Sequence, residues 1–172
     1  MMRKKRANAE GEAAGRPVSA SRTEMSEFAL PQDTNLLGSV LGGRVMHLVD
    51  MAGAATALRH CRTAVVTASV DYLDFRNPIH VGELIIVKAS MNRAFHTSME
   101  IGVKVFSEDL LTGERKHTTS AYLTFVALDE MQQPTSVPPL IAETAEDRRR
   151  YRQALGRRKI RLAHRSRAGS RP

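Results

Sequence analysis

The sequence predicts an α+β domain in which a curved antiparallel β-sheet wraps one long central helix. Two observations support this prediction. Residues 42–59 have an apolar helical pattern without proline, and several other segments either are rich in β-branched residues or alternate apolar and polar side chains. A long helix laid across one face of such a sheet buries both patterns. The 172 residues suffice for one domain with tails.

The strands are expected on both sides of the helix. The first is short, with Met25 and Phe28 among polar residues, and Pro31 ends it. The others follow the helix as an antiparallel meander, and Thr112-Gly113 forms a turn between the last two. The predicted bounds of these later strands are residues 65–75, 84–94, 99–106 and 116–128.

Charge divides the chain into a body and two basic tails. Of the formal net charge of +8, residues 1–22 contribute +4 and residues 143–172 contribute +8, so the part between them carries −4. The first tail lacks periodicity and is predicted to be disordered. Residues 23–130 form the predicted domain, and residues 131–142 form a Pro-rich linker. The last tail has acids first and arginines after, which predicts a basic helical extension.

Composition excludes several classes of protein. Cys61 is the only cysteine, and the six histidines show no spacing of the HExxH kind, so we expect neither a metal nor a cofactor. No apolar run is long enough to span a bilayer and no signal-peptide pattern is present, so we expect a cytoplasmic protein without a membrane partner. The basic tails lack interleaved aromatics and zinc or helix-turn-helix signatures, so no specific nucleic-acid partner is expected.

Asp50 is the only charged residue of the predicted helix between Arg44 and Arg59, and we expect it to be at least partly buried. A buried carboxylate costs free energy unless it has partners. Two interpretations stay open. Asp50 is either a satisfied core acid, bonded to a loop or a neighbouring subunit, or a carboxylate poised to act as general base or nucleophile.

The start of the helix offers complementary chemistry. Gly42 and Gly43 lie there, where free N–H groups and the helix dipole can hold a developing oxyanion. Asn35, in the preceding loop, can orient a water or a carbonyl. Gly42 and Asp50 lie about 12 Å apart along a helix, too far to touch one reacting carbon. If both are catalytic, they belong to different protomers that meet at an interface.

The face of the helix around Asp50 supports such an interface. Met46, Gly53, Ala54 and Ala57 lie near Asp50 at helical spacing, and three of these four residues are small. We therefore expect a partner to approach this face closely. The neighbouring face is expected to pack on the sheet, and its residues are Val45, Leu48, Ala52, Ala55 and Thr56.

Three stretches, taken together and in this order, resemble the hotdog-fold acyl-CoA thioesterases of the cytosolic acyl-CoA hydrolase branch: TNLLGSVLGGRVMHLVD, VVTASVDYLDFRNPIHVGE and HTSMEIGVKVF. The resemblance covers roughly residues 23–130, and many members of the family also carry a basic C-terminal helix. It implies the hotdog fold, acyl-CoA as substrate, and hydrolysis to a free fatty acid and coenzyme A. It also implies a homodimer with a joined sheet and an interfacial active site, often assembled into a trimer of dimers.

The same resemblance implies roles for individual residues. The family's catalytic Asn falls on Asn35 and its catalytic Asp on Asp50 of the other protomer, with an oxyanion donor at Gly42 or Gly43. Asp50 would activate a water or attack the thioester directly, and the sequence leaves both routes open. Coenzyme A needs cations for its phosphates and polar groups for its pantetheine. The candidates are Arg59, Arg76, Arg93, the tail arginines from Arg148 to Arg158, Thr67, Ser69 and Ser98.

Two alternative functions also stay open. A hotdog hydratase or dehydratase would transfer protons through a histidine, for which His80 in the turn NPIHVG is the candidate. A non-catalytic acyl-CoA-binding or nucleic-acid-associated regulator would use the basic tails, and salt-dependent binding of DNA or RNA would indicate it. Serine-hydrolase and dinucleotide-binding functions are excluded, because neither GxSxG nor GxGxxG is present.

Overall fold

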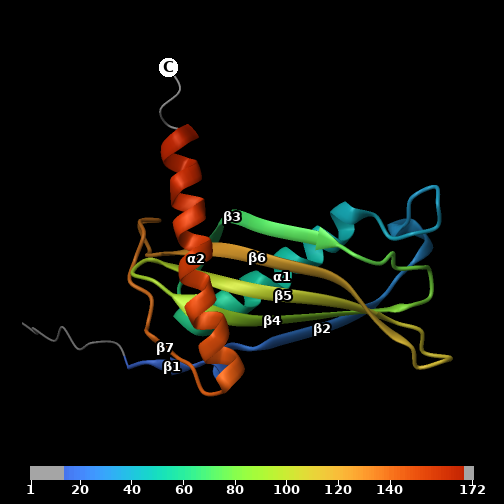
Figure 1. Cartoon of the computed structure of the whole chain (residues 1–172), viewed down its shortest axis with the longest axis horizontal. Coiled ribbons are helices and arrows are strands. Elements are labelled where there is room, and N and C mark those ends of the chain that lie inside the picture. Colours follow the sequence, from blue (N-terminus) through green and yellow to red (C-terminus); the bar gives the residue numbers. More distant parts are fainter. Residues whose placement is uncertain (1–13, 169–172) are drawn as a thin grey trace, which may run out of the picture.

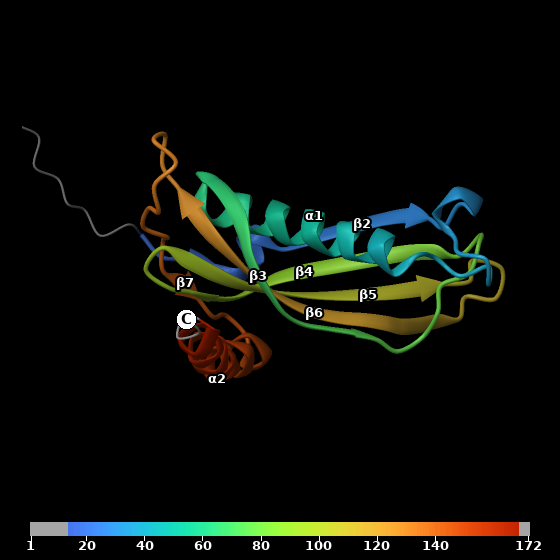
Figure 2. The ribbon, with the colours of Figure 1, turned by 90° about the horizontal axis from the view of Figure 1, so that it is seen from above.

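The structure, a computed structural model, describes residues 14–168, with side chains described as far as residue 164. A long helix, α1 (Gly42–Cys61), packs on one face of a five-stranded antiparallel sheet. A second helix, α2 (Ala145–Ala168), crosses the opposite face, so the sheet separates the two helices (Figures 1 and 2). The predicted α+β architecture, a long helix against a curved antiparallel sheet, is confirmed.

The strand order of this sheet is β2-β4-β5-β6-β3. Its strands are β2 (Thr23–Phe28), β3 (Ala64–Phe75), β4 (Leu84–Ala94), β5 (Ser98–Glu108) and β6 (Arg115–Leu128). The predicted meander holds for β4, β5 and β6 but not for β3, which pairs with β6. The edge beside β4 is occupied by β2, so β3 adds to the far edge. In the part of the chain that the structure describes, one side of β3 is therefore unpaired.

The beginning of the described chain differs from the predicted disorder over residues 1–22. Two short strands, β1 (Arg16–Pro17) and β7 (Leu140–Ile141), pair in parallel, and a 3-10 helix, η1 (Val18–Ser21), follows β1. Val18 is fully buried. The burial of Val18 and the pairing of β1 with β7 thus hold residues 16–21 and the end of the predicted linker 131–142 in place. Residues 1–13 of the predicted disordered tail lie outside the described range. A second 3-10 helix, η2 (Pro31–Asp33), follows β2.

The core lies between α1 and the sheet. Val45, Leu48 and Ala52 are buried there, as expected. Gly53 and Ala57 are buried as well, so the expectation that they face a partner is wrong. A Cβ atom added at Gly53 would lie 3.0 Å from two ring carbons of Phe125 on β6. The small residue at position 53 thus serves close packing of α1 on the sheet.

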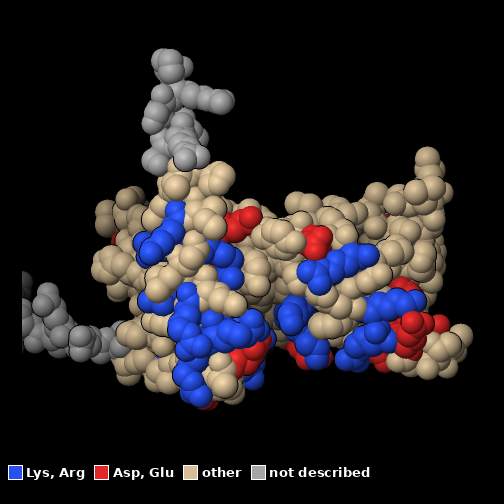
Figure 3. All heavy atoms as spheres, viewed as in Figure 1, with Lys and Arg blue, Asp and Glu red and all other residues tan. Residues whose placement is uncertain are grey.

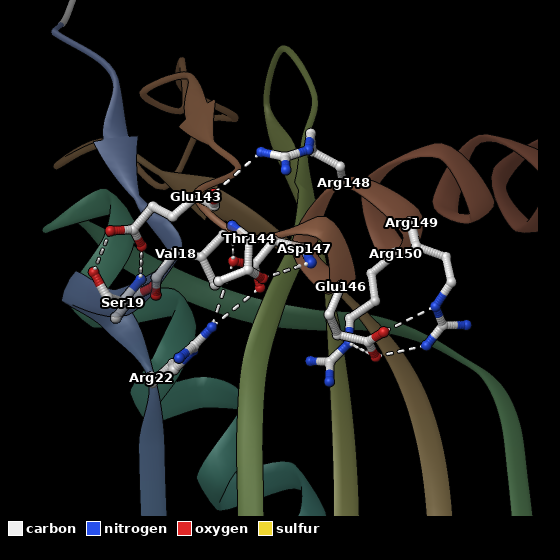
Figure 4. Close-up of polar contacts among 11 residues, drawn as sticks. Val18, Ser19, Arg22, Glu143, Thr144, Glu146, Asp147, Arg148, Arg149 and Arg150 are labelled. Atoms are coloured by element: carbon white, nitrogen blue, oxygen red, sulfur yellow. Dashed lines mark hydrogen bonds and ion pairs between the residues drawn. The ribbon is translucent and has the colours of Figure 1, made fainter.

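Polar contacts hold the start of α2. Thr144 and Asp147 form a capping box, with Thr144 N–H donating to Asp147 Oδ2 at 3.0 Å and Asp147 N–H donating to Thr144 Oγ1 at 3.1 Å (Figure 4). Arg22 pairs with the same carboxylate at 3.1 Å. Burial alone raises the pKa of Asp147, but the bonds from Thr144 and the charge of Arg22 together hold that pKa below its ordinary value.

Further along α2, charged and aromatic side chains replace apolar packing. Arg157 donates to the fully buried Glu100 at 2.6 Å, and its guanidinium lies 3.9 Å from the ring centroid of Tyr122. Arg161 pairs with Asp71 on β3. Within the described residues, no helix is both long and apolar enough to cross a membrane.

Candidate functional site

Asp50 lies near the middle of α1, where its side chain contacts the edge strand β3. It is half-buried, and its Oδ1 accepts a hydrogen bond of 2.7 Å from Thr67 Oγ1. Within the described chain, Oδ2 carries no hydrogen bond. One carboxylate oxygen is thus held in place while the other is available to a water or a reacting carbon. The sequence singled out both residues, but it did not pair them.

The edge of β3 beside this carboxylate is suited to pairing with another strand. Thr67 lies opposite Phe125 of β6, and irregular pairing follows it between Thr67 and Ser69. The other side of β3 has no neighbouring strand in the described sheet. Val66, Val70 and Tyr72 leave about half of their surface exposed. An unpaired strand edge with exposed apolar side chains is typical of a surface that pairs with another chain.

Asn35 turns the loop before α1 through the oxygen of its side-chain amide. Its Oδ1 accepts from the N–H of Leu37 at 2.8 Å and of Ser39 at 3.2 Å, and Gly38 completes the turn with a φ of +74°. Within the described residues, Nδ2 has no hydrogen bond. Because the turn uses the carbonyl oxygen, Asn35 offers only donors to a ligand. The neighbouring Leu36 and Leu37 are almost fully exposed.

The start of α1 presents unused N–H groups. In the described chain, the N–H groups of Gly42 and Gly43 donate no hydrogen bond, as expected for the first turn of a helix. A cavity of about 310 Å³ lies beside Gly42, lined in part by Phe75 and Arg76. The helix is continuous from Gly42 to Asp50, so about 12 Å separates them. The two groups therefore do not act on one carbon within one chain.

Ser69 lies on the outer face of the sheet, where Ser69 Oγ donates to Asp71 Oδ1 at 3.0 Å. It lines a groove of about 750 Å³ between β3 and the second half of α2, here called the β3 groove. The wall from α2 includes Arg157, Arg161 and His164. Sequence reasoning missed the last two, although their spacing of four and three residues places all three on one face of a helix.

The remaining candidates mostly hold the fold together. Arg59 donates to the backbone oxygen of Arg22 at 2.7 Å and to Thr23 Oγ1 at 3.1 Å, and so joins α1 to the start of β2. The guanidinium of Arg93 lies 3.9 Å from the ring centroid of Tyr151 and anchors α2. Ser98 starts β5, which β6 separates from β3. None of the three is brought to Asp50.

Arg76 remains near the helix start. It pairs with Asp74 at 2.8 Å, and the hydrogen bond to that carboxylate raises the pKa of Arg76. Among the described residues, no group of three or more His, Cys, Asp or Glu side chains could hold a metal ion.

A family model described as the thioesterase superfamily matches residues 37–114. Protein VdlD of Helicobacter pylori is 40% identical over 144 residues, covering 83% of this chain and 82% of that protein. The uncharacterized acyl-CoA thioester hydrolase YkhA of Bacillus subtilis is 37% identical over 147 residues, covering 84% and 86%. The mouse acyl-coenzyme A thioesterase 11 is 36% identical over 85% of this chain, which spans only 25% of that protein.

Solved structures give the same result. An apo hexameric acyl-CoA thioesterase superposes with a TM-score of 0.86 at 41% identity, covering 92% of this chain and 99% of that chain. The acyl-CoA hydrolase of Staphylococcus aureus, solved with butyryl coenzyme A and coenzyme A, gives a TM-score of 0.85 at 33% identity, covering 90% and 94%. These likenesses confirm the predicted hotdog fold.

The Staphylococcus aureus hydrolase has also been solved with an asparagine, an aspartate or a threonine replaced by alanine. In that chain the asparagine precedes the aspartate by 15 positions and the threonine follows it by 17. Asn35, Asp50 and Thr67 have the same two spacings.

Proposed function

Because the chain belongs to the thioesterase superfamily, we propose that it is an enzyme that hydrolyses acyl-CoA to a free fatty acid and coenzyme A. The observation that carries the proposal is the hydrogen bond of 2.7 Å that fixes Asp50 against Thr67 at a free sheet edge. The matching spacing of Asn, Asp and Thr in the Staphylococcus aureus hydrolase supports the same three residues as the site.

The active site is shared between two chains that pair through β3. The unpaired side of β3, its exposed apolar side chains and the exposed leucines beside Asn35 support this arrangement. A two-fold axis through the joined edge brings Asn35 and the start of α1 of one chain to Asp50 of the partner subunit. Hexameric relatives support three such dimers in one assembly, a trimer of dimers.

Hydrolysis follows from the groups in this shared site. The thioester carbonyl lies against the free N–H groups of Gly42 and Gly43, which stabilise the oxyanion together with the helix dipole. Asn35 Nδ2 donates to the attacking water or to the substrate. Asp50 Oδ2 takes the proton of that water, which adds to the carbonyl carbon and expels the thiolate of coenzyme A. In the second route the Asp50 carboxylate attacks the carbonyl carbon first, the C–S bond breaks and the thiolate of coenzyme A leaves, and water then cleaves the resulting anhydride.

The β3 groove is the proposed path for the coenzyme A part of the substrate. It begins at Ser69, close to Thr67 on the same strand, and basic side chains of α2 form its wall. Asp71 and Glu100 already bind Arg161 and Arg157, which leaves His164 as an additional polar group on this wall. Arg76, beside Gly42, is another candidate for a phosphate.

The proposed chemistry uses only protein groups and water, so no cofactor is proposed; coenzyme A belongs to the substrate. Cytosolic acyl coenzyme A thioester hydrolases of rat, mouse and human, 34–35% identical, support a cytoplasmic location. The hydratase alternative rests on His80 alone, which is exposed, whereas several of the relatives named above are thioesterases or acyl-CoA hydrolases by name. The nucleic-acid alternative has no motif in its support, and neither a nucleic-acid nor a membrane partner is proposed.

The first experiment measures thiol release from acyl-CoA esters of several chain lengths. We expect turnover by the wild-type chain, and we expect Asp50→Ala to lower kcat by at least about a thousandfold with unchanged circular dichroism. Glu130→Ala, which truncates an exposed carboxylate, serves as the control and keeps full activity. Undiminished thiol release by Asp50→Ala would contradict the assignment.

A second experiment tests the shared site. Asn35→Ala and Asp50→Ala chains are each inactive, but a dimer of one of each holds one site with both residues intact. Random mixing makes about half of the dimers hybrid, so about a quarter of wild-type activity should return. A mixture as inactive as its components would place the site within one chain.

A further inference from the structure

The second half of α2 contacts β3 through a short chain of polar groups on the outer face of the sheet. Asp71 Oδ1 accepts a hydrogen bond of 3.0 Å from Ser69 Oγ, and Asp71 Oδ2 pairs with Arg161 of α2. The side chains of Arg161 and Asp71 leave only 13% and 12% of their surface exposed. We call these three residues the β3 anchor. None of the three takes part in the bond-making steps of the proposed reaction.

The β3 anchor lies in an irregular part of the sheet. Register shifts leave two residues of β3, Ala68 and Asp71, without a partner on β6. An extra residue of this kind is a β-bulge, which bends a strand and re-aims the side chains around it. The first bulge comes directly after Thr67, whose hydroxyl holds Asp50. The position of Thr67 therefore depends on where this bulge lies.

The first bulge lets neighbouring side chains of β3 serve opposite faces of the sheet. Thr67 donates to Asp50 on α1, whereas Ser69 lines the β3 groove with α2, and the sheet separates the two helices (Figures 1 and 2). In a regular strand, residues two apart lie on the same face. The extra residue Ala68 thus allows Thr67 to face α1 while Ser69 faces α2. A slip of the bulge by one residue would turn Thr67 away from Asp50.

Burial does not hold the Thr67 hydroxyl in place. Thr67 is exposed in the described chain, and the far side of β3 has no neighbouring strand there. Its hydrogen bond to Asp50 therefore depends on the position of the β3 backbone. Figure 3 shows many basic side chains along α2, yet among the described residues Asp71 forms an ion pair with Arg161 only. Because both side chains are largely withdrawn from solvent, that pair specifies one position of the bulged segment.

We propose that Arg161 and Asp71 are positioning residues of the thioesterase site. Their ion pair fixes the bulge of β3, and the bulge holds Thr67 against Asp50. The inference rests on the proposed function, in which Asp50 is the catalytic carboxylate. It adds that the C-terminal helix serves the reaction from the face of the sheet opposite to α1. Because its guanidinium is engaged with Asp71, Arg161 acts on the chemical step and not on the binding of coenzyme A.

The test compares thiol release by variants of the full chain. Arg161→Ala should lower kcat at least about tenfold and keep KM within about twofold, because a misplaced Asp50 slows the reaction without weakening binding. Asp71→Asn keeps an acceptor for Ser69 but loses the charge, so it should have the same effect. Arg161→Lys should recover kcat to within about threefold of wild type, since one nitrogen makes the ion pair. The control is Lys159→Ala, which removes an exposed charge from the same helix and should keep full activity.

A double-mutant cycle separates positioning of Thr67 from docking of α2. Thr67→Val removes the hydroxyl that holds Asp50 and should itself lower kcat. Adding Arg161→Ala to Thr67→Val should then lower kcat by less than about another twofold, because the anchor acts through that hydroxyl. If Arg161→Ala does not fold, Asp71→Asn takes its place in the cycle. Losses that multiply, an unchanged kcat in Arg161→Ala, or a raised KM with unchanged kcat would each overturn the proposal.

Hydrogen–deuterium exchange measures the β3 anchor without catalysis. Arg161→Ala should speed exchange of the backbone N–H groups of residues 66–72 at least about fivefold, whereas Lys159→Ala should leave it within about twofold of wild type. Unchanged exchange in Arg161→Ala overturns the anchor whether or not the chain is active. If this exchange speeds up as expected but the wild-type chain releases no thiol, the failure lies with the proposed function and not with the anchor.

Discussion

The two helices lie on opposite faces of one sheet and are held there by different forces. On α1, Val45, Leu48, Val49 and Ala52 are at most 3% exposed, and the helix docks by burying apolar surface. On α2, Ala154 is the fully buried apolar residue of the described part, and docking relies on ion pairs and stacked rings. Apolar packing spreads the docking free energy of α1 over many contacts, whereas each ion pair of α2 depends on one partner, so the position of α2 depends on a few residues.

The largest effect on stability is expected at the ion pair of α2 whose carboxylate is fully buried. Arg157→Ala leaves the fully buried carboxylate of Glu100 without its charged partner, and the free energy of unfolding should fall by about 3 kcal/mol. Urea denaturation measures this loss. If the unpaired charge is the cause, adding Glu100→Gln to Arg157→Ala should restore most of the stability.

The control for this prediction is Arg152→Ala, which removes an exposed arginine from the same helix. Its effect should stay within about 0.5 kcal/mol. Equal losses in Arg152→Ala and Arg157→Ala would show that general charge, rather than the buried pair, holds α2.

A glycine in each helix allows the same substitution to be compared on the two faces. Gly53 on α1 faces the ring of Phe125, where a new Cβ atom would lie 3.0 Å from two carbons, whereas Gly156 on α2 has nothing within 4 Å. Gly53→Ala should destabilise the protein by about 1 kcal/mol, since overpacking exceeds the gain in helix propensity. Gly156→Ala should stabilise it by up to about 1 kcal/mol.

Thermal unfolding of both variants measures this difference. Opposite signs would confirm that α1 is limited by packing and that the exposed side of α2 is not. If Gly53→Ala is stabilising, the core has room beside Phe125, and the explanation given for the glycine is wrong.

The same contrast explains what the sequence could predict. The bounds of α1 and of the strands follow from local apolar periods, and the structure agrees with them closely. The contacts of α2 join residues 57 and 90 positions apart, Glu100 with Arg157 and Asp71 with Arg161, and no local pattern contains them. The sequence-based prediction of a meander misplaced β3 for the same reason. The place of β3 in the sheet depends on which edge β2 leaves free, and no local pattern shows this.

The candidate site was predicted in part. Asp50 and Asn35 stood out because a lone acid in an apolar helix and a polar loop before a double glycine are visible in the sequence. The hydrogen bond from Thr67 and the groove wall formed by Arg161 and His164 became visible only with the structure, because separate elements bring these side chains together.

The smallest expected effect concerns the last turn of α1, where one polar side chain enters the apolar layer. His60 is 1% exposed, and its Nε2–H donates to the backbone oxygen of Pro138 at 2.9 Å, while Nδ1 is buried and has no hydrogen-bond partner among the described residues. Burial lowers the pKa of His60 below 6.5; the bond to Pro138 opposes this shift, and the charge of Arg16 adds to it. At a pH just below 6.5, the unfolded chain therefore binds a proton at His60, whereas the folded chain keeps His60 neutral.

The sign of the pH dependence follows from this difference. The stability contribution of neutral His60 is complete above about pH 6.5 and is lost progressively as the pH falls below that value. Glu146, whose pKa is lowered to about 2 by its bonds to Arg149 and Arg150, titrates at lower pH and does not contribute to this window. The melting temperature of the wild-type chain should therefore fall between about pH 6.5 and 5.

His60→Gln keeps a donor for the oxygen of Pro138 but does not titrate, so its melting temperature should be flatter over the same range. His96→Gln, at an exposed histidine, is the control and should keep the wild-type slope. If His60→Gln retains that slope as well, protonation of His60 does not limit stability in acid. The pH response would then arise elsewhere than in the polar contact that ends α1.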